Sequence, residues 1–138
     1  MNEYTFKNIE VGLKEQFEIT IFEEMMTKFC AISGDTNPLH LDSSYAQSRN
    51  LKDRVVYGLL ASSFYSTFVG VYLPGKYAML QGINIKFNSP VFIGDQLIIS
   101  GRISHTNEVF KVVEIKAKIV NQNNNKVSSA KITVGLLK

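Results

Sequence analysis

The sequence has a single cysteine, Cys30, among its 138 residues. One cysteine cannot form a disulfide within the chain, so an intracellular setting is the simplest expectation. The chain also lacks an apolar run long enough to cross a bilayer, and residues 1–7 carry charges where a secretory signal would be apolar. We therefore expect a cytoplasmic protein without a membrane partner.

Neither sign of charge dominates. The chain has fifteen Lys and Arg residues and twelve Asp and Glu residues, which gives a formal net charge of +3. This excess is too small to indicate nucleic acid, and no basic block interleaved with aromatics is present. It would favour an anionic ligand through long-range steering. The length and the 45% hydrophobic content are typical of one globular domain, expected over residues 1–138.

The first predicted helix runs from about Ile21 to Ile32, with apolar residues at helical spacing. Thr20 can serve as its N-cap, and Glu23 three residues later completes a capping box. Gly34 can end the helix in a left-handed conformation. Asp42 is expected to cap a short helix that follows.

A second helix is predicted from Tyr57 to about Leu73. Between Val55 and Leu73 the chain has no charged residue at all, so nearly every face of this helix should avoid water. Such a helix belongs in the middle of a domain.

The rest of the chain is rich in β-branched and aromatic residues with two-residue alternation. Strands are expected at Tyr77–Phe87, Gln96–His105, Val109–Val120 and Val127–Leu136, with an early strand near Gln16–Ile19. Turns are expected at Gly94-Asp95, at Thr106-Asn107 and over the polar stretch Asn121–Asn125. The pattern predicts an α+β domain in which an antiparallel sheet covers one apolar helix.

The loop between the two helices contains Asp35, Asn37, Pro38 and His40. Pro38 restricts Asn37 to extended geometry, which could bring Asp35 and His40 to one side of the loop. A carboxylate and an imidazole that converge can hold and polarise a water molecule for general acid–base catalysis. Asp, Asn and Pro are also ordinary turn formers, and from the residues alone this structural interpretation is the favoured one.

Other chemistry finds little support. A buried cysteine is usually an inert packing residue, so Cys30 is not favoured as a nucleophile. Cys30, His40 and His105 do not form a zinc-ligand spacing, and the segment from Asp35 lacks the glycine and glutamate of a calcium loop. No metal and no cofactor are expected.

The pattern Ser33-Gly34-Asp35-x-Asn37-Pro38-x-His40 closely resembles the hydratase signature of the MaoC-like, (R)-specific enoyl-CoA hydratases. Three further landmarks resemble that family in the same order, over roughly residues 22–101. They are Val55–Ser62, Leu73-Pro74-Gly75 and Phe87–Asp95. The resemblance implies the hot-dog fold, an antiparallel sheet wrapped around a long central apolar helix. It also implies pairing of sheets in a homodimer.

For the site, the resemblance implies that Asp35 and His40 activate one water for addition to the β-carbon of a trans-2-enoyl thioester. The product would be an (R)-3-hydroxyacyl thioester, and the reverse dehydration uses the same groups. The backbone N–H of Gly58 would face the thioester oxygen at a helix N-terminus. Three serine and asparagine side chains would support the site: Ser66 on the central helix, and Asn37 and Ser33 in the loop. One departure is Tyr57, where the family usually has histidine.

Several alternatives remain open. The thioester carrier could be coenzyme A or acyl carrier protein. The depth of the acyl pocket would depend on large residues such as Phe64, Phe68, Tyr72 and Tyr77, and a bulky lining favours a short acyl group. An acyl-carrier-protein-linked 3-hydroxyacyl dehydratase or a hot-dog acyl thioesterase would commonly place an acidic residue on the central helix, and this helix has none. A non-catalytic acyl-binding module would be expected to have lost Asp35 or His40, and both are present.

Overall fold

The computed structural model describes residues 1–138 and contains one five-stranded antiparallel sheet in the order β1-β3-β4-β5-β2. The strands are β1 (Lys14–Thr20), β2 (Ala78–Phe87), β3 (Gln96–Asn107), β4 (Val112–Val120) and β5 (Lys126–Leu136). All four later strands and the early strand were predicted from the sequence, with boundaries shifted by a few residues.

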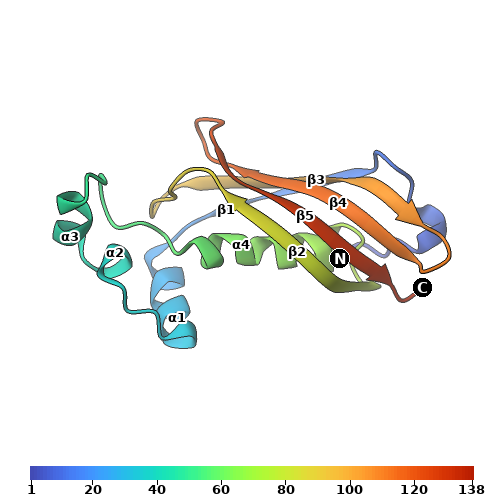
Figure 1. Ribbon diagram of the computed structural model, residues 1–138, viewed down its shortest axis with the longest axis horizontal. Coiled ribbons are helices and arrows are strands. Elements are labelled where there is room, and N and C mark those ends of the chain that lie inside the picture. The colour runs from blue at the N-terminus through green and yellow to red at the C-terminus, as the bar shows by residue number, and fades with distance from the viewer.

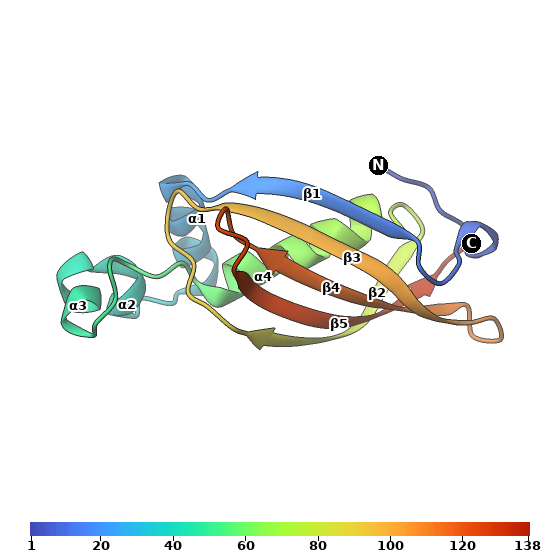
Figure 2. The same cartoon turned by 90° about the horizontal axis from the view of Figure 1, so that it is seen from above.

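The helices lie against one face and one end of this sheet (Figures 1 and 2). They are α1 (Glu23–Ser33), α2 (Pro38–Leu41), α3 (Ser43–Ser48) and α4 (Gly58–Thr67), with short turns η1 (Phe6–Asn8) and η2 (Phe68–Tyr72, π-helical). The helix α4 runs along the sheet and continues into η2, while α1, α2 and α3 gather beyond one end. This confirms the predicted sheet wrapped around a central helix.

The core fills the space between α4 and the sheet. On β4, every second side chain is fully or almost fully buried, as two-residue alternation requires, for example Val113, Ile115 and Ile119. From the helical side, Phe68 packs so closely on β3 that a Cβ at Gly101 would lie 2.9 Å from its ring. A glycine at that position therefore lets the central helix approach the sheet.

The central helix is not enclosed on all sides, contrary to the expectation from its lack of charge. Leu59, Ser63 and Ser66 are exposed, and their spacing of four and three residues places them on one stripe of α4. The sheet covers one side of the helix only, which leaves this stripe free (Figure 1). None of the helices is long and apolar enough to span a bilayer.

The capping box predicted at Thr20 is wrong. Thr20 is the last residue of β1 and pairs with Gln96, and the ladder continues as the N–H of Ile21 donates to the carbonyl of Asp95 at 3.0 Å. The helix therefore begins later, with Phe22 as N-cap and no side-chain cap. Its predicted end is confirmed, since Gly34 has φ 71°.

The start of the third predicted strand is also wrong. Residues 108–111 form a turn instead, and Lys111 has φ 53° there, so β4 begins at Val112. In contrast, Asp42 caps α3 as predicted, because its Oδ1 accepts from the N–H of Tyr45 at 3.1 Å.

Candidate active site

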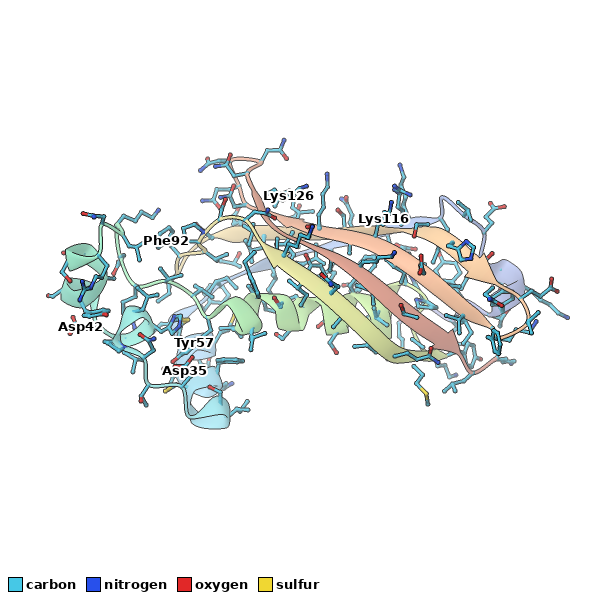
Figure 3. The ribbon with its side chains drawn as sticks, in the orientation of Figure 1. Asp35, Asp42, Tyr57, Phe92, Lys116 and Lys126 are labelled. Carbon is cyan, nitrogen blue, oxygen red and sulfur yellow. The ribbon has the colours of Figure 1, made fainter.

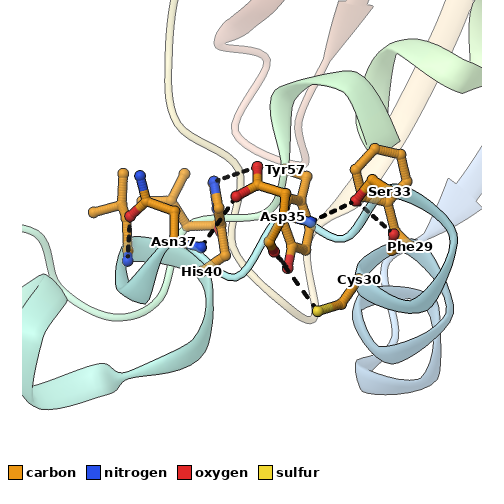
Figure 4. A network of polar contacts seen from close by, with 9 residues as sticks. Phe29, Cys30, Ser33, Asp35, Asn37, His40 and Tyr57 are labelled. Carbon is orange, nitrogen blue, oxygen red and sulfur yellow. Dashed lines mark hydrogen bonds and ion pairs between the residues drawn. The ribbon is translucent and has the colours of Figure 1, made fainter.

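The loop between α1 and α2 is fixed by hydrogen bonds within a few residues (Figure 4). Ser33 donates to the carbonyl of Phe29 at 2.8 Å, and its oxygen accepts from the N–H of Asp35 at 3.2 Å. Asn37 is the N-cap of α2, and its Oδ1 accepts from the N–H of Leu39 at 2.9 Å. These bonds hold the loop although its residues are exposed to solvent.

The Asp35 carboxylate has one oxygen engaged and one free. Its Oδ1 accepts from the N–H of Asn37 at 3.0 Å. Its Oδ2 faces Nε2 of His40 at 3.9 Å. That separation is too long for a direct hydrogen bond but suits a water molecule that contacts both groups. The side chain of Asp35 is 46% exposed, so water and substrate can reach it.

The His40 ring is held in one orientation from the opposite side. Its Nδ1 lies 2.7 Å from the carbonyl oxygen of Val55. Because a carbonyl oxygen only accepts hydrogen bonds, Nδ1 must carry a proton. In the neutral ring, Nε2 then has a lone pair directed toward Asp35. The side chain is only 13% exposed, so its position is set by packing.

Tyr57 contacts both Asp35 and His40 and helps to hold them in place. Its ring stacks on that of His40, with centroids 4.1 Å apart and an interplanar angle of 29°. Its hydroxyl donates to the backbone carbonyl of Asp35 at 2.7 Å, and the thiol of Cys30 lies 3.6 Å from the same oxygen. Burial and then the contact with Cys30 raise the pKa of Tyr57 to about 12, so the hydroxyl stays protonated as a donor.

A pocket of about 330 Å³ opens beside His40. Gly58, the first residue of α4, lines it, together with Ser62 one turn later. The first N–H groups of a helix have no partner within the helix and carry a partial positive charge. A Cβ on Gly58 would lie 2.9 Å from the ring of Phe87, which also lines the pocket. Glycine therefore allows Phe87 to close against the helix N-terminus.

The predicted residues do not all gather at this pocket. Asp35 and His40 are adjacent, and Gly58 shares the pocket with His40. Ser66 instead lies on the exposed stripe of α4 and does not line the pocket. The serine of α4 that lines the pocket is Ser62, whose hydroxyl donates to the carbonyl of Gly58 at 2.8 Å.

The four aromatic residues expected to set the depth of an acyl pocket lie away from the pocket beside His40. None of Phe64, Phe68, Tyr72 and Tyr77 lines the pocket. Phe68 packs on Gly101 in the core, and Tyr72 stacks on Phe17 with ring centroids 4.6 Å apart. The large aromatic at the pocket is Phe87, which comes from the end of β2. Sequence periodicity could have placed Phe87 on a strand end but not beside the helix N-terminus.

The site has a carboxylate and an imidazole but no third metal-binding partner. No group of three His, Cys, Asp or Glu side chains is arranged to hold a metal ion. The arrangement offers a carboxylate, an imidazole whose Nδ1 is bonded to a backbone carbonyl, and the backbone N–H groups of a helix N-terminus.

Comparisons with known proteins agree on the family and the fold. The family model of the MaoC-like domain matches residues 5–125. An (R)-specific enoyl-CoA hydratase of Aeromonas caviae is 30% identical over 116 residues, which cover 84% of this chain and 87% of that protein. A solved structure described as an (R)-hydratase from A. caviae involved in PHA biosynthesis superposes with a TM-score of 0.90 at 28% identity, covering 94% of this chain and 98% of the other.

A more distant relative carries a different name. A mitochondrial 3-hydroxyacyl-[acyl-carrier-protein] dehydratase of Arabidopsis thaliana is 33% identical over 75 residues. The match covers 54% of this chain and 44% of that protein, so this chain spans less than half of its length.

Proposed function

The chain belongs to the MaoC-like domain family, and from this premise we propose that it is a hydro-lyase. It adds water reversibly to a short-chain trans-2-enoyl-CoA to give the (R)-3-hydroxyacyl-CoA. The observation that carries the proposal is the 3.9 Å gap between Asp35 Oδ2 and His40 Nε2, next to the pocket that contains Gly58. The named hydratase of A. caviae and its structure support the same activity.

In the hydration direction, one water lies between Asp35 and His40. Its oxygen forms the bond to the β-carbon while the dyad takes one of its protons. The electrons of the double bond move onto the thioester oxygen, where the N–H of Gly58 and the helix dipole stabilise the negative charge. The enolate then returns its electrons to the α-carbon, which receives a proton from the dyad. The net change is addition of H and OH across the double bond.

The size of the pocket supports a short acyl group. Ligand pockets usually enclose about 300–1,000 Å³, and this one has about 330 Å³. Phe87 and the β2–β3 loop residues Asn88 to Val91 line it. Replacing Phe87 with Ala should therefore extend the range of accepted acyl chains to longer ones. The measurement is kcat/KM for a series of enoyl-CoA substrates of increasing length.

The test of the activity follows loss of the conjugated enoyl absorbance when purified protein is added to crotonyl-CoA. Asp35→Asn and His40→Gln should each lose about a hundredfold or more in rate, as expected for loss of acid–base catalysis. The matched controls are Asp42→Asn and His105→Gln, which make the same chemical changes at exposed positions outside the pocket. Both controls should retain activity.

Free thiol released in this assay would contradict hydration and indicate a thioesterase. Equal activity in Asp35→Asn and Asp42→Asn would place the chemistry elsewhere. If the crotonyl-CoA reaction is slow, the same enoyl group on acyl carrier protein should be compared. A strong preference for that carrier would support the alternative of an acyl-carrier-protein-linked dehydratase, in line with the Arabidopsis relative.

The proposal includes a homodimer. The strand β2 is at one edge of the sheet, and Met79, Ile83 and Phe87 on it are exposed. An open strand edge with apolar side chains is suited to pairing with a second strand. The exposed stripe of α4, which includes Ser66, would then be available to the partner. Sedimentation velocity should show a dimer, and Ile83→Glu should shift it to a monomer.

Two further expectations stay predictions. The single buried core shared by all five strands and α4 supports one domain over residues 1–138. Limited proteolysis should then leave the whole chain resistant, with cleavage confined to the ends. The cytoplasmic location would be tested by fractionating cells that express the tagged full-length protein.

A further inference from the structure

The face of the sheet opposite α4 has a row of positive charges in register. The row consists of Lys14, Arg102, Lys116 and Lys131, which lie directly opposite one another on β1, β3, β4 and β5. All four are exposed, whereas the next residues along three of the strands, Ile103, Ile115 and Ile132, are fully buried. In Figure 3, Lys116 and Lys126 stand on the side of the sheet away from α4.

A second row reinforces the first. It lies two residues further along the strands, where Lys118 on β4 and Lys86 on β2 lie opposite Ser129 of β5 from its two sides. This face has only two carboxylates, Glu18 on β1 and Glu114 on β4. Glu114 lies 4.0 Å from Lys131. Glu15, which follows Lys14 directly, points to the other face.

This arrangement costs the free protein stability. Like charges directly opposite on neighbouring strands destabilise a sheet, and here three successive strand pairs carry such contacts. The chain has a net charge of only +3, so the clustering is not a consequence of a highly basic composition. A bound polyanion would turn the repulsion into attraction.

The surroundings of the cations restrict what the polyanion can be. They line a hollow of about 1160 Å³ whose only hydrophobic lining residues are Ala117 and Ala130. A protein partner would require apolar or aromatic anchors, and lysine is depleted in protein interfaces. Single-stranded nucleic acid would require aromatic side chains for stacking. Membrane association through an inserted surface would require apolar side chains that project from it.

We propose that this face binds a linear polyphosphate chain. Such a chain has a negative charge on every phosphate unit and has no bases or apolar groups for a protein to recognise. Lysine ammonium groups bind phosphate as point charges, which suits a ligand without fixed geometry. Neighbouring strands are about 4.8 Å apart, so the four cations extend over roughly 14 Å. A single phosphate cannot contact all four of them, whereas a chain can.

The site is separate from the hydratase site. None of the cations in the row lines the pocket that contains His40 and Gly58. Substitutions in the row should therefore leave the hydration rate unchanged, and binding of the chain does not depend on the proposed activity.

The experiment measures binding of long-chain polyphosphate to the full-length protein by fluorescence anisotropy, at several salt concentrations. If four cations each neutralise one phosphate, the affinity should fall about a hundredfold between about 50 and 200 mM salt. Arg102→Gln/Lys116→Gln removes two of the four, so the same change in salt should lower its affinity only about tenfold. Pyrophosphate should bind at least about tenfold more weakly than the long chain.

The matched control is Lys7→Gln/Lys28→Gln. It has the same net charge as Arg102→Gln/Lys116→Gln but keeps all four cations of the row. It should bind like the original protein. In low salt without ligand, Arg102→Gln/Lys116→Gln should also have a higher melting temperature than the original protein, because repulsion across β3 and β4 is relieved. The difference should disappear in high salt.

Three outcomes would overturn the proposal. They are no binding of long-chain polyphosphate at low salt, equal losses in the two double variants, and tighter binding of duplex DNA or anionic vesicles than of polyphosphate at matched phosphate concentration.

Discussion

Two regions of this molecule are held in place by different means. The loop from Ser33 to His40 is almost entirely exposed and is fixed by short-range hydrogen bonds, such as those of Ser33 and Asn37. The sheet and α4 are fixed by burial of residues such as Ile115 and Phe68. Changes in the core should therefore affect folding first, while changes at the loop should affect chemistry first.

The largest expected effect on stability is in the core. Ile115→Ala removes a fully buried side chain from the middle of the sheet and should lower the free energy of unfolding by about 2–5 kcal/mol. The rate per folded molecule should be unchanged. Urea denaturation and the crotonyl-CoA assay on one preparation check both statements. Lys118→Ala, on the exposed side of the same strand, should change stability by about 0.5 kcal/mol or less.

At the junction of the two regions, Gly58→Ala should reduce activity more than stability. The added Cβ would lie 2.9 Å from the Phe87 ring, so the ring or the start of α4 must shift. A small displacement of the N–H donors should lower kcat/KM by roughly tenfold to a hundredfold. Gly70→Ala is the matched control, because its Cβ would meet nothing within 4 Å. Recovery of activity in Gly58→Ala/Phe87→Ala would assign the loss to this clash.

A smaller effect on activity is expected for Tyr57, which contacts the catalytic loop. Tyr57→Phe keeps the ring on His40 but removes the donor to the Asp35 carbonyl. A loss of about 1 kcal/mol corresponds to a roughly fivefold lower kcat. Tyr4→Phe removes a hydroxyl that donates to Glu15 at 2.7 Å, and neither residue lines the pocket, so this change should not lower kcat. Equal values of kcat in both variants would show that Tyr57 does not position Asp35.

The last effect appears only at alkaline pH. Burial raises the pKa of both Tyr57 and Tyr65 to about 12, whereas the unfolded chain has ordinary tyrosines near pH 10. Between these values the unfolded state releases protons that the folded state keeps, so stability falls as the pH rises from about 10 to 12. The double variant Tyr57→Phe/Tyr65→Phe should lose less stability over this window. Identical slopes in urea denaturation would contradict the assignment.

The same division explains what the sequence could predict. The existence of the five strands, the Gly34 helix end and the Asp42 cap follow from patterns within a few residues and were confirmed, although the strand predicted from Val109 begins at Val112. The proximity of Asp35 to His40 was also expected from one short motif. Thr20 failed as a cap because β1 pairs with a strand more than seventy residues later in the chain.

Features that depend on long-range pairing could not be predicted. The pocket brings Val55, Phe87 and Ser128 together from separate elements, and their distances depend on how α4 packs on the sheet. The row of cations exists only because of the register between β1, β3, β4 and β5. A shift by one residue on one strand would send its cation to the buried face, so composition alone gave no sign of the row.

The bond from His40 to Val55 has a consequence for engineering. The N–H of Val55 also donates to the carbonyl of Leu39 at 3.1 Å, so both ends of the segment 41–54 are joined at its base. This segment, which contains α3, is a loop closed at its base, so its length does not set the position of His40. Because lengthening a closed loop costs little entropy, Asn50 at its exposed turn is a suitable insertion point for a peptide tag or a fluorescent label.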